Sequence, residues 1–146
     1  MAVKFPKYIF GLHDPGGEFL MADKNKRGWI VFTHELGHNP AHQGGFDYRR
    51  WTDHGYGAIA RLNNGYGSTG TIPLPQHYDG FSRRVRNWVE ASQGCGIWVI
   101  GNEMNHGQER PEGQPITPAQ YAQCYHKCWQ QILSEDPGKK AEWDQY

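Results

Sequence analysis

Two short segments of this chain combine residue types that perform chemistry in proteins. The first, His34-Glu35-Leu36-Gly37-His38, matches the H-E-x-x-H pattern of zinc metallopeptidases. In those enzymes the two histidines lie one helical turn apart and bind the metal, and the glutamate is the general base. Here the segment follows a strand-like run at residues 29–32, Pro40 comes soon after it, and the third histidine of the extended pattern is missing. We therefore predict a polar loop after a strand, without bound zinc, and keep a zinc metallopeptidase as the less favoured alternative.

The second segment is the pair Asn102-Glu103, which follows a hydrophobic run at residues 97–100. A protonated glutamate at the end of a strand can give its proton to a leaving oxygen, and an ionised one can activate water. The preceding asparagine can hydrogen-bond the 2-hydroxyl of a sugar, a contact that strengthens in the transition state of glycoside hydrolysis. The pair is therefore a candidate for acid/base catalysis on a glycoside. A solvated carboxylate at the end of a strand is the alternative.

Four runs rich in β-branched and aromatic residues would position these segments. They lie at residues 8–12, 29–32, 58–62 and 97–100, and each passes into a polar tail that contains glycine. Each run is largely apolar throughout rather than alternating, which predicts strands buried on both faces, as in parallel sheets. Because the carboxyl ends of parallel strands meet at one edge, we expect the polar tails to form a site there.

Helical patterns lie between and after these runs. One apolar stripe at helical spacing consists of Tyr78, Phe81, Val85, Trp88 and Val89. The last helix should begin with Thr117 as N-cap, Pro118 at the first position and Gln120 at the capping-box position. Weaker helical patterns lie at residues 18–26 and 47–54, so strand and helix alternate four times. This order predicts an α/β fold with a parallel sheet, and we expect residues 1–146 to form one domain.

Composition excludes several classes of protein. The 15 basic and 15 acidic residues give a net charge of zero, so we expect neither a nucleic-acid nor a membrane partner. Aromatic residues make up 14% of the chain, which is unlike disordered segments. Three cysteines argue against a disulfide scaffold, and no apolar run approaches the length of a membrane span. No signal peptide is visible, which predicts a cytoplasmic protein by default.

Two longer stretches resemble a known family. Residues 61–75, RLNNGYGSTGTIPLP, and 97–106, IWVIGNEMNH, resemble bacterial glycosidase-like proteins of the clan of (β/α)8-barrel retaining glycoside hydrolases with an Asn-Glu acid/base motif. The resemblance spans nearly the whole chain but corresponds to the N-terminal half of such a barrel. It implies that the chain is a (β/α)4 half of a TIM barrel, with Glu103 as acid/base and Asn102 as its neighbour on the sugar.

Further substrate contacts are expected from the position of residues at strand ends. Arg61 and Asn63 on the third strand, and His13 and Asp14 on the first, would line the cleft. Tyr66, in a loop flanked by glycines, is the expected platform on which a sugar ring stacks. No cofactor is implied, and the expected ligand is a carbohydrate.

The resemblance also implies that part of the family's site is missing. The family's nucleophile is a glutamate at the end of the seventh strand, and a complete barrel takes ~250 residues. Asp14, Glu18 and Glu35 lie in strand-end segments, but none matches the nucleophile motif. We therefore expect the acid/base half of a retaining glycosidase site, with little or no hydrolysis by this chain alone. The alternatives are a non-catalytic half-barrel that binds carbohydrate or has a structural role, and one half of a longer enzyme.

Half of a barrel should also associate with itself. Its first and fourth strands would be edges with unpaired backbone groups, and its inner face would lack a covering layer. We expect Phe10, Val31, Ile59 and Val99, or their neighbours, on that inner face. Two chains related by a two-fold axis could pair the fourth strand of one with the first strand of the other. The sequence therefore predicts a homo-oligomer, a dimer that closes the barrel.

Overall fold

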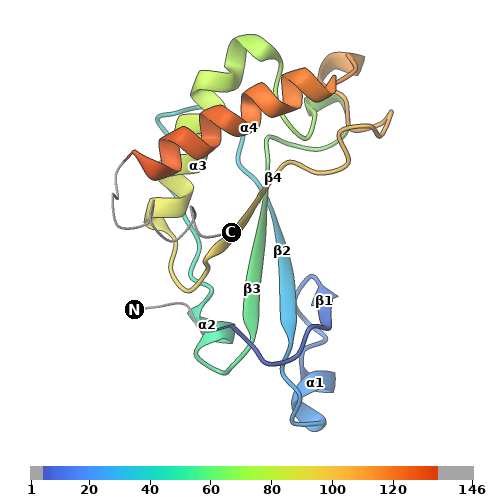
Figure 1. Ribbon diagram of the computed structural model, residues 1–146, viewed down its shortest axis with the longest axis vertical. Helices are drawn as coiled ribbons and strands as arrows, with labels where there is room; N and C mark the ends of the chain where they lie inside the picture. Colours follow the sequence, from blue (N-terminus) through green and yellow to red (C-terminus); the bar gives the residue numbers. More distant parts are fainter. Residues whose placement is uncertain (1–4, 135–146) are drawn as a thin grey trace.

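Four parallel strands form one sheet in the computed structural model, which describes residues 5–134. The strands are β1 (Gly11–His13), β2 (Trp29–Glu35), β3 (Gly57–Asn63) and β4 (Ile97–Ile100), in the order β1-β2-β3-β4 (Figure 1). Every neighbouring pair is parallel. The predicted α/β class and the four predicted strands are therefore confirmed.

Four α-helices alternate with the strands, as predicted. They are α1 (Phe19–Asp23), α2 (Arg49–Thr52), α3 (Tyr78–Ala91) and α4 (Pro118–Leu133). Short 3-10 turns are η1 (Gly67–Thr69), η2 (Pro75–His77) and η3 (Pro111–Gly113). The capping box of α4 is confirmed, because Gln120 N donates to Thr117 Oγ1 at 3.2 Å and Thr117 N donates to Gln120 Oε1 at 2.9 Å. None of the helices in the described part of the chain is both long and apolar enough to span a bilayer.

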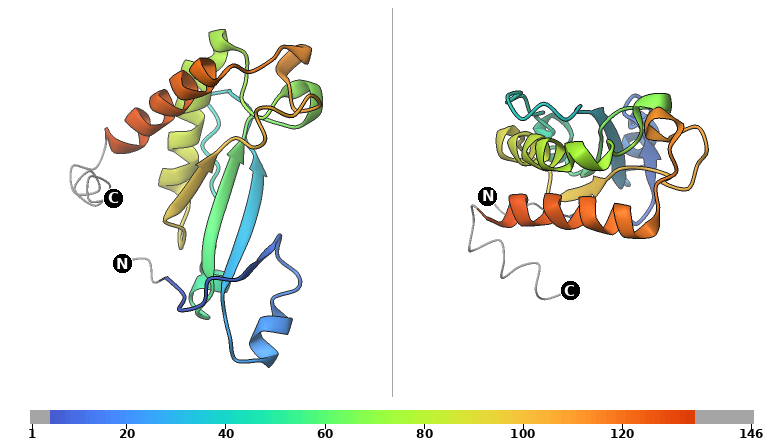
Figure 2. Two further views of the ribbon diagram at one scale, coloured as in Figure 1. Left: turned by 45° about the vertical axis from the view of Figure 1, so that its right-hand side comes forward. Right: turned by 90° about the horizontal axis from the view of Figure 1, so that it is seen from above.

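One face of the sheet carries the hydrophobic core. The strand side chains buried there are Ile30, Phe32, Ala58, Ala60, Leu62 and Ile100. The helices add Tyr78, Phe81 and Val85 from α3, and Cys124 and Cys128 from α4. Helix α3 runs antiparallel to the strands over this face, and α4 packs against α3 and lies obliquely to the strands (Figure 2). Each large apolar side chain that is fully buried contributes about 1.5–3 kcal/mol, so this face holds the helices in place.

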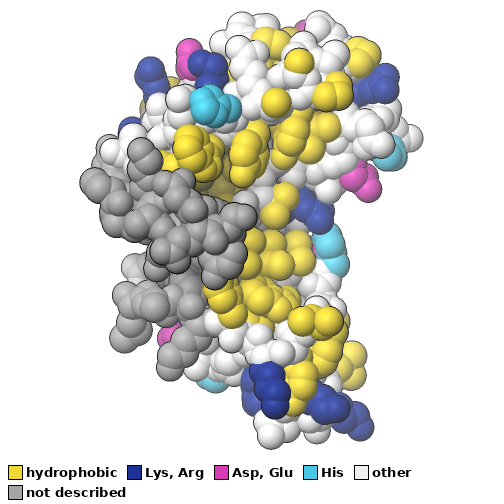
Figure 3. All heavy atoms as spheres, viewed as in Figure 1, with side chains coloured by type: hydrophobic (Ala, Val, Ile, Leu, Met, Phe, Trp, Pro, Cys, Tyr) yellow, Lys and Arg dark blue, Asp and Glu magenta, His cyan; other side chains and the backbone are white. Residues whose placement is uncertain are grey.

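The opposite face of the sheet, called the open face below, is covered by none of the described helices. One row of side chains across it consists of His13, Val31, Ile59 and Ile97. The next row consists of Thr33, Arg61 and Val99. Figure 3 shows hydrophobic side chains gathered over the strands on this side, below α4, with basic and histidine side chains beside them. The prediction of strands buried on both faces is therefore wrong, because residues 5–134 supply a covering layer for one face only.

The first strand begins later than predicted. Trp29 N donates to Phe10 O at 2.9 Å, but β2 begins at Trp29, so residues 8 and 9 have no neighbouring strand to pair with there. Register places Gly11 on the open face, and Ile9 lines the same concavity as Val31 and Ile59. Because side chains alternate along extended backbone, Phe10 belongs to the helix side. The prediction that Phe10 faces inward is therefore wrong, and Ile9 takes its place.

Candidate functional site

Polar side chains gather at the carboxyl ends of the strands. Glu35 ends β2, Asn63 ends β3, and the sheet register pairs the two directly. Arg61 lies two residues before Asn63, so its side chain points to the same side of the sheet. Asp14 follows β1 at once, and its backbone N–H donates to Val31 O at 2.9 Å. The open face is therefore apolar near the start of the strands and polar where they end.

Two loops close over this polar end. The loop after β3 is held as a tight turn, because Gly65 N donates to Gly70 O at 3.0 Å. It contacts the loop after β4, where Thr71 N donates to Glu109 O at 3.4 Å. Gly70 has a φ of 80°, and a Cβ there would lie 2.6 Å from Pro111 N, so only glycine allows this approach. The contact brings Glu109 to the site from 46 residues farther along the chain than Asn63.

Charged groups surround Tyr66, whose side chain is 46% exposed at the tip of the first loop. The pKa of Tyr66 is raised above its usual value of 10, first by partial burial and then by the charges of Glu35, Asp14 and Glu109, whereas Arg61 lowers it. These four groups therefore lie close enough to the phenol to act on it electrostatically. A Cβ at Gly65 would lie 3.1 Å from Glu35 Oε1, which places this carboxylate against the same loop. Three carboxylates against one guanidinium make the site negatively charged.

Asn63 is a fully buried polar residue of the site, and Thr71 beside it is equally buried. Its Oδ1 accepts a long hydrogen bond of 3.5 Å from Thr71 Oγ1, and Thr71 Oγ1 accepts one from the backbone N–H of Asn102. The amide is thereby oriented, and its buried Nδ2 bonds to no other residue within 5–134. Buried polar groups are nearly always hydrogen-bonded, so this donor is suited to an acceptor on a bound ligand.

Glu103 directly follows Asn102, whose backbone N–H donates to Thr71 Oγ1 beside Asn63. It follows β4 by three residues, its side chain is exposed, and its φ of 33° is a left-handed conformation that non-glycine residues rarely adopt. Backbone strain of this kind costs about 1–3 kcal/mol and is concentrated at functional sites. Its carbonyl accepts from His106 N at 2.7 Å, which fixes the turn. Within the described residues, no hydrogen bond or ion pair connects the Glu103 carboxylate to the groups around Tyr66.

The structure thus unites some of the predicted residues and separates others. Arg61 and Asp14 lie close enough to Tyr66 to act on it electrostatically. Asn63 is paired with Glu35 in the sheet register and is joined through Thr71 to the backbone of Asn102. His13 is exposed beside Asp14, with His13 Nδ1 3.0 Å from Asp14 Oδ2. Such an exposed pair stabilises little.

The sequence analysis missed Glu109. Its position on an irregular loop carries no local signal, and only the packing of the two loops reveals its role. Glu35, by contrast, was recognisable as a carboxylate at the end of a strand.

The H-E-x-x-H segment does not form a metal-binding helix. His34 belongs to β2 and lies on the helix side, where its Nε2 shares a hydrogen bond with Tyr48 OH at 2.8 Å. His38 lies in the following loop, and its Nδ1 donates to Asn64 Oδ1 at 3.0 Å. The prediction that the two histidines do not share a helix face is therefore confirmed. Among residues 5–134, no three His, Cys, Asp or Glu side chains are grouped so that they could hold a metal ion.

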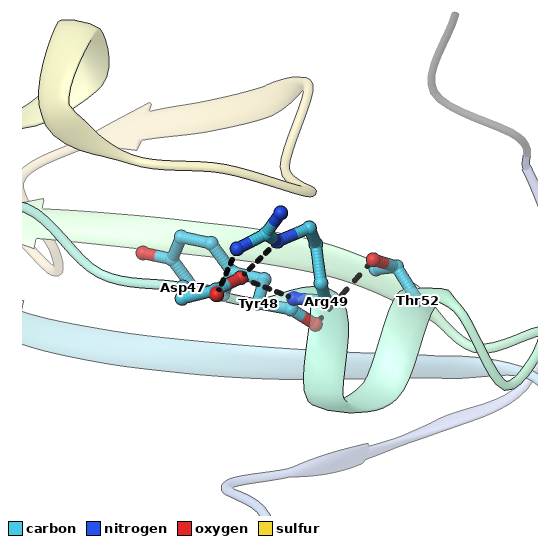
Figure 4. A network of polar contacts seen from close by, with 4 residues as sticks. All are labelled: Asp47, Tyr48, Arg49 and Thr52. Carbon is cyan, nitrogen blue, oxygen red and sulfur yellow. Dashed lines mark hydrogen bonds and ion pairs between the residues drawn. The ribbon is translucent and has the colours of Figure 1, made fainter. Parts of the chain in front are cut away.

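Tyr48 holds His34 in the core and is itself anchored at the start of α2. Asp47 accepts from Arg49 Nη2 at 2.6 Å and from Arg49 Nε at 2.8 Å, and Thr52 Oγ1 donates to Tyr48 O at 3.4 Å (Figure 4). The hydrogen bond from Arg49 lowers the pKa of Asp47 to about 2. Burial lowers the pKa of His34 below its usual 6.5, so this histidine is a neutral core residue. Its role is structural.

Comparison with known proteins gives no further information about this site. No protein-family model, no curated protein and no solved structure matches the chain. The functional argument therefore rests on the chemistry of the site itself.

Proposed function

We propose that this protein binds a carbohydrate at the carboxyl edge of its sheet, as the acid/base half of a glycoside hydrolase-like site. The observation that carries the proposal is the buried Asn63 Nδ2, which lacks a partner within 5–134 and lies among groups that bind sugars. Carboxylates such as Glu35 accept hydrogen bonds from hydroxyl groups, and Arg61 donates them. The half-exposed ring of Tyr66 offers an apolar face to a sugar ring.

The roles of the individual residues follow from their chemistry. Asn63 would donate to a sugar hydroxyl, and Tyr66 would stack on the ring. Glu103 would be the acid/base, giving its proton to the glycosidic oxygen as the bond from that oxygen to the sugar breaks. Asn102 would hydrogen-bond the 2-hydroxyl. Retention would require a second carboxylate as nucleophile, and for this chain alone we expect binding with little or no hydrolysis.

The fold proposed with this function is a (β/α)4 half of a TIM barrel, completed by self-association. The all-parallel order β1-β2-β3-β4 supports this assignment, and so do helices packed on one side of the sheet. The open face corresponds to the interior of such a barrel, and its carboxyl end is where barrel enzymes place their sites. A non-catalytic half-barrel that binds carbohydrate remains the second candidate, favoured because, among the described residues, Glu103 is not one of the charged groups that act on Tyr66.

The charge of the site narrows the class of sugar. Asp14, Glu35 and Glu109 outnumber the single cation Arg61, so a sugar that carries a carboxylate would be repelled. We therefore expect neutral oligosaccharides to bind more tightly than oligosaccharides of uronic acids of the same length. This difference should shrink at high salt, because screening weakens the repulsion.

Isothermal titration with neutral oligosaccharides tests the proposal. The Tyr66→Ala variant should bind about tenfold more weakly than the parent, equivalent to about 1.4 kcal/mol. Tyr125→Ala is a matched control, because Tyr125 on α4 is also a half-exposed tyrosine, 44% against 46%, but lies away from the site. No binding across a panel of neutral sugars would overturn the proposal, and so would equal binding by the Tyr66→Ala variant and the parent.

Hydrolysis of unactivated oligosaccharides and of activated aryl glycosides separates the two candidates. A steep loss of oligosaccharide turnover in the Glu103→Gln variant, with a smaller loss for aryl glycosides, would support an acid/base role for Glu103, because a good leaving group needs little protonation. Sugar binding without turnover in either protein would favour the non-catalytic half-barrel.

A further inference from the structure

An apolar groove runs beside β4 on the helix side of the sheet. Trp98 and Ile100 of β4 form one wall, and Tyr125, Trp129 and Ile132 of α4 form the other. In residues 5–134 the only strand paired with β4 is β3, so the outer backbone edge of β4 has no strand beside it. Helix α4 therefore presents an apolar surface next to an unpaired edge, in the position where a helix would cover the next strand of a sheet.

The opposite edge of the sheet carries an exposed apolar segment. Ile9 is 97% exposed and Phe10 is 45% exposed, just before β1. Phe10 belongs to the helix side and Ile9 to the open face, as the register of Gly11 shows. Among the described residues, β2 is the only strand that pairs with β1. This segment therefore has a free backbone edge and one apolar side chain for each side of a sheet.

We propose that the two edges bind each other in a pair of identical chains. Residues 8–10 and β1 of one copy lie along β4 of the other, with Phe10 in the groove between β4 and α4. Ile9 then joins Val99, which is 40% exposed, on the inner face. A two-fold axis makes the same contact twice, so both edges of both copies are paired. This inference rests on the half-barrel of the proposed function and specifies its partner.

Charge and size favour a second copy as the occupant. Among residues 5–134, no charged side chain lines the groove. None lies within residues 8–12, and the net charge of the chain is zero, so net charge does not oppose the pairing of two copies. Closure also covers the apolar part of the open face, including Val31 and Ile59. Obligate dimers bury on the order of 2,000 Å² or more, so the open face must be covered together with the two edges for the dimer to be stable.

Light scattering coupled to size-exclusion chromatography tests the contact. The parent should have twice the chain mass of 16.7 kDa. Ile9→Asp and Val99→Lys should each be monomeric, because each puts a charge into both contacts. Neither residue is buried, and circular dichroism will show whether the variants keep the fold of the parent. Leu20→Asp on α1 is a matched control, since Leu20 is 58% exposed but lies at neither edge, and it should remain dimeric.

A mixture of the two edge variants gives the sharpest result. In a mixed dimer, one contact joins two unaltered edges and the other joins opposite charges, so mixing should restore the dimer that neither variant forms alone. A monomeric parent would overturn the inference, and so would edge variants of unchanged mass or a mixture that stays monomeric.

Sugar titration of the same proteins keeps the two proposals apart. The site around Tyr66 is built within one chain, so the monomeric Ile9→Asp variant should still bind sugar. A dimeric parent that binds no sugar would remove the proposed function and leave the contact standing.

Discussion

Replacing Asn63 should separate stability from binding. Asn63 Nδ2 is buried without a partner within 5–134, so the folded chain bears the desolvation of this donor, about 1–3 kcal/mol. Leucine has the same branched shape and no polar atom, but it is larger than asparagine, and overpacking a buried site costs about 1–3 kcal/mol. The Asn63→Leu variant loses only the 3.5 Å bond from Thr71 Oγ1, which is too long to be strong. Because removal of the unpaired donor offsets part of the overpacking cost, we expect its free energy of unfolding to fall by about 1 kcal/mol or less, whereas sugar binding should be lost.

The neighbouring asparagine provides a matched control. Asn64 is 1% exposed, but its Nδ2 donates to Thr69 O at 2.9 Å and its Oδ1 accepts from His38 Nδ1 at 3.0 Å. The Asn64→Leu variant leaves both partners without a hydrogen bond and should lose about 2–4 kcal/mol.

Urea unfolding followed by circular dichroism measures both variants against the parent. A loss by Asn63→Leu as large as that of Asn64→Leu would show that Asn63 Nδ2 is satisfied inside the folded chain. That result would refute the reasoning, because the donor would then not be available to a ligand.

Three further predictions concern the helix side, the loops and α4. Burial lowers the pKa of His34 from 6.5, so below about pH 6.5 the unfolded chain binds a proton that the folded chain does not. The free energy of unfolding should therefore fall as the pH drops from 7 to 5, and urea titrations of a His34→Gln variant should show a smaller fall; equal slopes would contradict the shift. Gly70→Ala should cost about 2–4 kcal/mol, because its Cβ would meet Pro111 N at 2.6 Å. Gly67→Ala, with φ 56° and nothing within 4 Å, should cost only about 1–2 kcal/mol, and equal losses in thermal melts would argue against the close contact. Thr117→Ala should lose about 1 kcal/mol with its N-cap bond, whereas Thr117→Ser keeps the hydroxyl and should melt like the parent.

Local signals predicted several elements of the fold well. The run Ile97–Ile100 is β4 to the residue, and the capping box marks the start of α4. The first strand was less predictable, since an edge strand forms only where its neighbour offers partners. The prediction that the strands are buried on both faces was also wrong. A run of apolar residues indicates that both faces of a strand favour burial, but it does not show whether residues of the same chain cover each face.

The candidate site was predictable only in part. Arg61 and Asn63 follow from their position at the end of a strand, and Tyr66 follows from its glycine-flanked loop. Glu109 could not be found in this way, because its place depends on a glycine that lets two loops touch. The missing partner of Asn63 Nδ2 was equally hidden, since sequence shows the type of a polar residue but not which of its atoms are satisfied.

The two edges of the sheet are unlike, and this has a consequence for assembly. In the proposed dimer, an apolar segment at one edge and a groove at the other would form a head-to-tail contact, and a contact of this kind can in principle add copies without limit. For two copies to form a closed barrel, the sheet of each copy must curve through half a turn. The twist of the four short strands therefore determines whether the copies form a closed dimer or an open fibre. A change that flattens the sheet, leaving both edges intact, should therefore produce filaments that lengthen with concentration. The contact that pairs the edges in a closed dimer would then link successive copies into a filament.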